Sequence, residues 1–78
     1  NLLIKSIMYN RNNTARMLLA KGANPNVANI NGLRPIHAAA YAGNFELVKA
    51  LLIKDARLND KDNSGKSALD YAKASGNI

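Results

Sequence analysis

Residues 29–61 read NINGLRPIHAAAYAGNFELVKALLIKDARLNDK, and this stretch decides the fold. Pro35 can occupy the first turn of a helix, where its missing N–H costs no helical hydrogen bond. The alanine-rich run after it predicts a helix over residues 35–42, which the following Gly-Asn pair would end. Residues 45–54 predict a second helix, so this stretch is typical of two short helices joined by a tight turn.

The second predicted helix carries an apolar stripe with helical spacing. We expect this stripe to face the core, and it consists of Phe45, Val48, Leu51 and Leu52. The segments on either side of the helix pair, residues 22–34 and 55–67, are rich in Asn, Asp, Gly and Ser. That composition predicts turns or short hairpins.

The same pattern recurs along the chain with a period of 33 residues. The matched pairs are Leu18 and Leu51, Lys21 and Lys54, Ala23 and Ala56, Asn26 and Asn59, and Gly32 and Gly65. A fixed period between about 20 and 50 residues is typical of a stacked, solenoid-like array. The small alanines of each first helix would let neighbouring units pack closely.

Composition limits the remaining possibilities. The chain has 78 residues, of which 47% are hydrophobic and 21% charged, as in a single folded domain. Cysteine is absent, which excludes a disulfide scaffold and a thiolate metal site. No apolar run approaches the roughly 18 residues of a membrane span, so no membrane partner is expected. Because the sequence does not begin with Met, we expect it to be part of a longer polypeptide.

The net charge of +6 is unevenly distributed. Residues 1–45 contain five basic residues and no acidic one, whereas all five acidic residues follow Phe45. This asymmetry favours an acidic partner, whether a nucleic acid, a membrane surface or an acidic protein. The alternative is a solvated helical surface with no partner, because net charge also serves solubility.

Residues 29–59 resemble the ankyrin repeat, and the similarity extends back through residues 16–26 and forward through residues 65–77. The resemblance implies an all-α ankyrin-repeat solenoid, in which antiparallel helix pairs are joined by projecting hairpin loops. It also implies a protein that binds other proteins, rarely catalyses a reaction, and lies inside the cell in the cytoplasm or nucleus.

The repeat boundaries follow from the same resemblance. We expect one domain over residues 1–78, with a partial repeat at 1–28, a complete repeat at 29–61 and a partial repeat at 62–78. Because stacking of this kind needs about three repeats for stability, we expect flanking ankyrin repeats in the full-length chain.

Four positions depart from the family pattern. Arg34 replaces the usual Thr before Pro-Ile-His, so the contact between a hydroxyl and the His37 imidazole is in doubt. Asp70 replaces the His in the third unit. Asn10 and Asp55 replace glycines, and both residue types tolerate the left-handed conformation at a cost of at most about 1 kcal/mol.

Catalytic chemistry is not expected in this chain. His37 is the sole histidine, and it matches the structural His of the family more closely than a catalytic base. One His with scattered acids lacks the spacing of a metal site, and no phosphate-binding loop indicates a cofactor. Ser67 and Asp70 have the spacing of a helix-capping pair. We therefore expect no enzyme activity, no metal and no cofactor.

The family's contact surface, transferred position by position, predicts the partner-binding residues. They are Met8, Tyr9, Ile30, Asn31, Leu33, Tyr41, Ala42, Asn63, Ser64 and Lys66. Ile30 and Leu33 could instead pack against adjacent hairpins. Two alternatives to protein binding stay open: nucleic-acid binding through the basic first half and its tyrosines, and a purely structural segment of a longer array. Nucleic-acid modules usually cluster Lys and Arg among aromatics on one face, and this sequence shows no such cluster.

Overall fold

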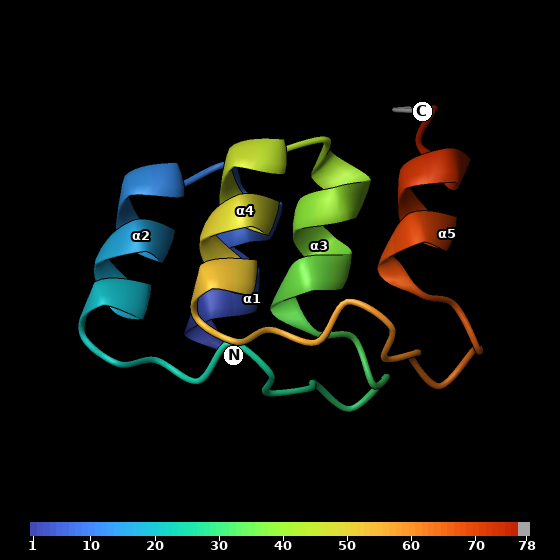
Figure 1. Cartoon of the computed structure of the whole chain (residues 1–78), viewed down its shortest axis with the longest axis horizontal. Helices are drawn as coiled ribbons and strands as arrows, with labels where there is room; N and C mark the ends of the chain where they lie inside the picture. The colour runs from blue at the N-terminus through green and yellow to red at the C-terminus, as the bar shows by residue number, and fades with distance from the viewer. Residues whose placement is uncertain (77–78) are drawn as a thin grey trace.

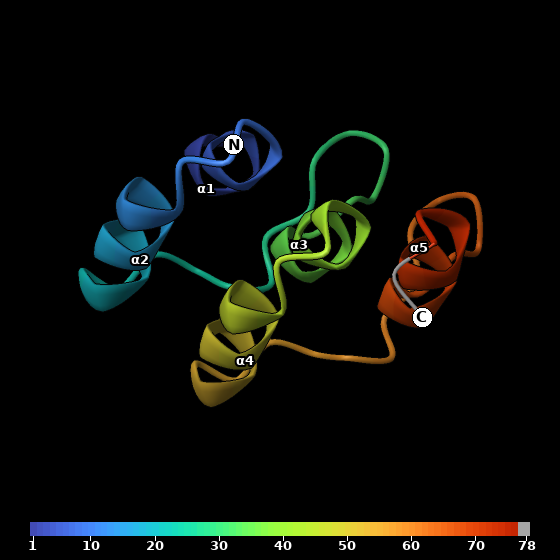
Figure 2. The same cartoon turned by 90° about the horizontal axis from the view of Figure 1, so that it is seen from above.

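The structure is a computed structural model, and it describes residues 1–76. Five helices occur in that range: α1 (Leu2–Met8), α2 (Asn12–Ala20), α3 (Pro35–Ala42), α4 (Phe45–Ile53) and α5 (Ala68–Ala74) (Figure 1). From above, the helices form two rows (Figure 2). We call α1, α3 and α5 the inner row, and α2 and α4 the outer row. Neighbouring helices touch within each row, and α1–α2 and α3–α4 pack as pairs. The predicted all-α solenoid is therefore confirmed.

Local sequence signals set the ends of the central helices. Pro35 is the first residue of α3, and Gly43 ends the helix in the left-handed conformation at φ 72°. Asn44 caps the next helix, because its side-chain oxygen accepts from the Leu47 N–H at 3.3 Å. The helix expected over residues 45–54 ends one residue earlier, and Lys54 is its C-cap.

Capping also starts the last helix as the sequence predicted. The Ser67 hydroxyl accepts from the Asp70 N–H at 3.4 Å, while the Asp70 carboxylate accepts from the Ser67 N–H at 3.0 Å. These two reciprocal bonds satisfy backbone donors that the first helical turn leaves unpaired. Asn10 and Asp55 adopt positive φ angles of 59° and 70°, so both hold the left-handed conformation expected at these glycine-like positions.

The two long connecting segments, which lead from α2 to α3 and from α4 to α5, form hairpin loops that run along one side of the helices (Figure 1). In the first complete loop the Asn29 N–H donates to the Leu33 carbonyl at 2.9 Å. In the next loop the Asp62 N–H donates to the Lys66 carbonyl at the same distance. Because residues 29 and 62 are 33 positions apart, both loops adopt the same local structure.

Small aliphatic residues fill the core between the rows. The buried apolar residues are Leu3, Ile4, Ile7, Ala15, Leu19, Ile36, Ala38, Ala39, Ala40, Leu47, Leu51, Ala56, Ala68 and Ala72. Ala39 lies in the middle of the inner row and is wholly buried. A larger side chain there would hold the inner helices apart, so the alanine run sets their spacing.

The predicted apolar stripe of α4 was wrong in two of its four positions. Leu51 is fully buried and Val48 packs partly buried against the core, whereas Phe45 and Leu52 are 49% and 40% exposed. Leu47, which was not in the predicted stripe, is also fully buried. The repeat register explains the Leu52 result, because its counterpart Leu19 in α2 is only 3% exposed. Helix α4 packs against α2, but no described helix covers the opposite side of α4.

Candidate functional site

Two hairpin tips build one side of the candidate site. The Asn29 side-chain oxygen accepts from the N–H groups of Asn31 and Leu33 at 2.9 and 3.0 Å. Asp62 repeats this pattern in the next loop, where Oδ1 accepts from the N–H groups of Ser64 and Lys66, both at 2.9 Å. Short Asx side chains favour such turns, so each loop holds its own tip in place.

Direct bonds join the two tips. The Asn63 N–H donates to the Asn31 carbonyl at 3.0 Å, and the Asn63 amide donates to the Ile30 carbonyl at 3.1 Å. Gly32 permits this contact, because a Cβ atom there would lie 2.8 Å from the Asn63 nitrogen and 2.5 Å from its Oδ1. Gly32 also has a φ of 75°, which residues with a side chain rarely adopt. Glycine is therefore required here both for the close contact and for the backbone conformation.

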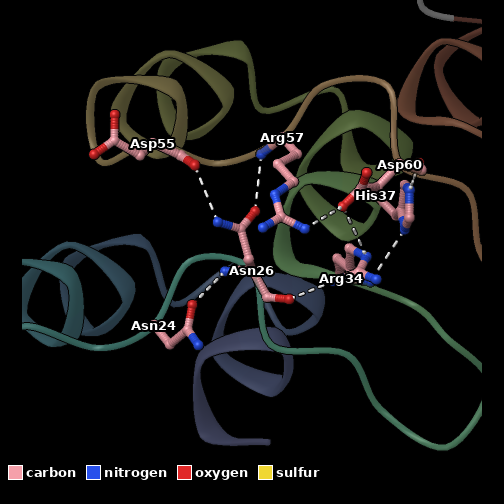
Figure 3. Close-up of polar contacts among 7 residues, drawn as sticks. All are labelled: Asn24, Asn26, Arg34, His37, Asp55, Arg57 and Asp60. Atoms are coloured by element: carbon pink, nitrogen blue, oxygen red, sulfur yellow. Dashed lines mark hydrogen bonds and ion pairs between the residues drawn. The ribbon is translucent and has the colours of Figure 1, made fainter.

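His37 anchors the inner row to the loops below it (Figure 3). Its Nδ1 accepts from the Arg34 N–H at 3.0 Å, which leaves the proton on Nε2 to donate to the Asp60 carbonyl at 2.8 Å. The side chain is completely buried. Backbone N–H thus replaces the hydroxyl that Arg34 lacks, and the predicted structural role of His37 fits these contacts.

Arg34 is committed to the same loop network (Figure 3). Its Nη1 donates to the Asn26 carbonyl at 2.6 Å, and its Nε lies 3.6 Å from the Asp60 carboxylate. The Asn26 side chain links neighbouring loops by donating to the Asp55 carbonyl at 3.0 Å and accepting from the Arg57 N–H at 2.8 Å. The Arg34 guanidinium is therefore bound within the loop network and is not a free surface cation.

An aromatic cluster forms the other side of the site. The Tyr71 hydroxyl donates to the Asp62 carboxylate, and its ring lies 5.5 Å from that of His37 and 6.2 Å from that of Tyr41, centroid to centroid. The Tyr41 and Tyr71 rings meet edge to face, a favourable aromatic geometry. The Lys66 ammonium lies 5.9 Å from the Tyr71 centroid, within reach of a cation–π interaction.

The hydroxyl–carboxylate bond alters both titrations. It is the main reason why the pKa of Asp62 is lowered, and the Lys66 N–H contributes next. The same bond, with burial as a second cause, raises the pKa of Tyr71 to about 12. The cluster therefore keeps the Tyr71 proton in place throughout the neutral range.

Between the tips and the inner row lies a hollow of about 640 Å³, which we call the groove. Its lining residues are Met8, Asn10, Asn31, Leu33, His37, Ala38, Tyr41, Ala42, Asp62, Asn63, Ser64 and Tyr71. A second hollow of about 260 Å³ is lined by Met8, Lys5 and Tyr9, among others. The two hollows share Met8, and we call them together the track.

The groove gathers most of the residues that the sequence predicted for partner binding. Those lining it are Met8, Asn31, Leu33, Tyr41, Ala42, Asn63 and Ser64. Tyr9 lines the second hollow, and Lys66 lies beside the groove on the Tyr71 ring. Ile30 lines neither hollow and is 93% exposed, whereas Leu33 is partly buried against the core. That these residues contact a partner stays a prediction.

Sequence reasoning missed part of the lining. Tyr71 and Ala38 were not among the predicted contact residues, although they occupy the same position in successive inner helices. The period of 33 residues relates them to each other and to Lys5, but it relates none of the predicted contact residues to them. Asp62 and Asn10 likewise match no predicted contact residue, because Asp62 shapes a loop turn and Asn10 follows a helix end.

A stack of helix pairs with a groove along its inner row belongs to the class of solenoid repeat proteins. The family described as ankyrin repeats (3 copies) matches residues 3–78. The chain therefore belongs to the ankyrin repeat family, as the sequence indicated.

Relatives of very different length share this segment. The potassium channel GORK of Arabidopsis thaliana is 34% identical over 77 residues, which cover 99% of this chain and 9% of the channel. The glycerophosphocholine phosphodiesterase gde1 of Schizosaccharomyces pombe is 34% identical over 68 residues, covering 86% and 6%. The ankyrin repeat-containing protein P1E11.10 of the same yeast is 39% identical over 51 residues, covering 65% and 25%. The chain thus spans a quarter or less of these relatives.

Family membership defines the role in general terms. Ankyrin repeats generally mediate protein–protein interactions and are typically non-catalytic. None of the helices within residues 1–76 is long and apolar enough to cross a lipid bilayer. In the same range, no three His, Asp or Glu side chains come together in a way that could hold a metal ion.

Proposed function

We propose that this chain is a protein-interaction module that binds its partner in the groove. The observation that carries the proposal is the groove itself, whose volume lies within the range of ligand sites. Apolar and aromatic groups from Met8, Leu33 and Tyr41 converge there, and amide side chains surround them. Clustered aromatic and apolar side chains with a polar rim are typical of binding hot spots.

The charge of the surface favours an acidic partner. Among the described residues, ion pairs join Arg34 and Arg57 to Asp60, and no other basic side chain forms one. Asp62 and Asp70 accept internal hydrogen bonds. The net charge of +6 remains after all the acidic residues are counted, and such a field speeds encounter with an acidic partner.

Nucleic-acid binding is the less supported alternative. Arg34, one of the five basic residues in the first half, is tied to Asn26 and Asp60 inside the loops. The residues lining the groove include no Lys or Arg, so it offers no row of cations for a phosphate backbone. The two ligand classes also differ in salt dependence, which makes them separable.

A titration of the full-length protein against a purified partner tests the proposal. We expect Tyr41→Ala to raise the Kd by at least about 30-fold, the effect of losing a hot spot of about 2 kcal/mol. Ile53→Ala is the control, because Ile53 is exposed on α4 and lines neither hollow. Circular dichroism checks that both variants fold.

The same titration with DNA and RNA at two salt concentrations tests the nucleic-acid alternative. Tight, steeply salt-dependent binding of nucleic acid that is unchanged by Tyr41→Ala would overturn the proposal.

A further inference from the structure

A basic residue lies at each end of the track, and none lies between them. Lys5, on α1, lines the second hollow. Lys66 lies beside the opposite end, with its ammonium 5.9 Å from the Tyr71 ring. Between them the lining contains no basic residue and one acidic residue, Asp62. The track therefore has a mixed lining of apolar and amide side chains, with a cation at each end.

Asp62 does not offer its carboxylate to a partner. One oxygen accepts from the N–H groups of Ser64 and Lys66 at 2.9 Å, and the other accepts from the Tyr71 hydroxyl. A basic partner would find both oxygens already bonded in the groove. Carboxylates on a partner, in contrast, would find two cations, so charge complementarity favours an acidic segment.

The amide side chains on the groove indicate the backbone form of that segment. Asn10 and Asn31 line the groove, and neither side-chain amide forms a hydrogen bond with another described residue. An extended peptide has backbone N–H and C=O groups that such amides can pair with, whereas a helix satisfies its own. The rim is therefore better suited to an extended chain than to a helix.

We propose that the groove receives an extended segment of a partner protein in which one large apolar side chain is flanked by carboxylates. The apolar side chain packs between Met8, Leu33 and Tyr41, and the carboxylates face Lys5 and Lys66. This proposal rests on the proposed function, because it takes the groove as the binding surface.

The probe is a library of displayed random peptides, selected against the 78-residue chain after circular dichroism confirms its helices. We expect the enriched peptides to carry a large apolar residue with acidic residues on both sides. Enrichment of basic or wholly polar peptides, or no enrichment, overturns the proposal. Displayed peptides are used because they present every charge pattern without assuming a known partner.

One enriched peptide is then synthesised, and its Kd is measured by fluorescence anisotropy. Replacing its apolar residue by Ala should raise the Kd at least about tenfold, because that side chain would no longer be buried in the groove. Lys5→Glu with Lys66→Glu should raise the Kd about tenfold at low salt and less at high salt. A peptide with Lys in place of its acids should bind this double variant better than the original peptide does.

Matched controls separate local from general effects. Lys21→Glu with Lys49→Glu makes the same change in net charge away from both hollows, and Met17→Ala matches Met8→Ala. If the peptide responds to Met8→Ala and Tyr41→Ala but equally to both charge variants, the charge arrangement is wrong and groove binding stands. If it responds to neither Met8→Ala nor Tyr41→Ala, the proposed function fails as well.

Discussion

Asp62 and Asn29 occupy the same place in successive loops and differ by a single atom type, yet they have different consequences. Both accept from the two N–H groups that shape the loop tip. The carboxylate of Asp62 has a second charged oxygen, and that oxygen holds the Tyr71 hydroxyl. Two differences between the units, Asp62 for Asn29 and Tyr71 for Ala38, thus link a loop tip to the last inner helix.

Replacing that carboxylate should lower the pKa of the Tyr71 hydroxyl. Asp62→Asn keeps an acceptor for the loop N–H groups but removes the charge, so the Tyr71 pKa should fall from about 12 towards its ordinary 10.0. Because the folded pKa is raised, this bond stabilises the fold below pH 10 and is lost as the pH rises towards 12. Tyrosinate absorbance measures the titration. Tyr71→Phe should remove the step near pH 12, and a step unchanged by Asp62→Asn would contradict the assignment.

His37 should matter for stability. Truncation to Ala would leave the Arg34 N–H and the Asp60 carbonyl without partners and open a cavity in the inner row. We expect a loss of about 2–4 kcal/mol in the free energy of unfolding, measured by urea denaturation. Lys73→Ala, at an exposed position on α5, should change little. An unfolding midpoint like that of the wild type would show that these bonds are dispensable.

At the scale of elements, the hairpin loops are as organised as the helices. Bonds between successive loops run from Asn26 to residues 55 and 57, and from Asn63 back to residues 30 and 31. The loops therefore form a second layer of contacts beneath the helices. Their tips are placed by backbone geometry, and Gly32 is where that geometry is tightest.

Two glycine substitutions distinguish the stability lost through backbone strain from the stability lost through a steric clash. Gly22 and Gly32 both have positive φ, but a Cβ at Gly22 meets nothing within 4 Å. We expect Gly22→Ala to cost about 1 kcal/mol from backbone strain alone, and Gly32→Ala to cost more than about 2 kcal/mol because it also separates the tips. Thermal unfolding of both variants provides the comparison. Equal losses would show that the contact with Asn63 relaxes easily.

The sequence predicted where the helices and loops occur better than which of their side chains are buried. Pro35, Gly43 and the period of 33 residues were sufficient for the helices and loops, because those signals are local. Burial of Leu52 depends on which helices lie beside α4, and a single helix pattern carries no such information. Likewise, Leu33 and Ile30 lie close together in the sequence, but Leu33 packs against the core whereas Ile30 is exposed at the hairpin tip.

At the scale of the whole molecule, one side of the stack is unfinished within residues 1–76. Leu52 and Leu69 are 40% and 53% exposed, whereas their counterparts one period earlier, Leu19 and Ile36, are buried. In the first two units an outer helix covers those positions. The exposed pair therefore marks where a further outer helix would pack, and it limits the stability of this chain alone.

A consensus ankyrin repeat fused after residue 78 should raise the unfolding midpoint. The fusion would bury Leu52 and Leu69, and each fully buried leucine is worth about 1.5–3 kcal/mol. The control carries Leu52→Ser and Leu69→Ser in the fused chain, which should lose most of the gain. For the 78-residue chain alone we expect a midpoint within or below the usual mesophile range. A cooperative transition above about 70 °C would contradict the inference that the exposed Leu52 and Leu69 limit its stability.

The bonds that join the loops have a consequence for how the chain finds its structure. The side-chain hydrogen bonds that link described residues of different units connect positions 8 to 33 residues apart, so none spans more than one period. Sequence separation between contacting residues controls folding speed, and here these bonds reach no further than the neighbouring unit. Adding units would lengthen the molecule but would not increase the sequence separation between the residues that contact one another. Such a protein can grow by gene duplication with little penalty in folding time.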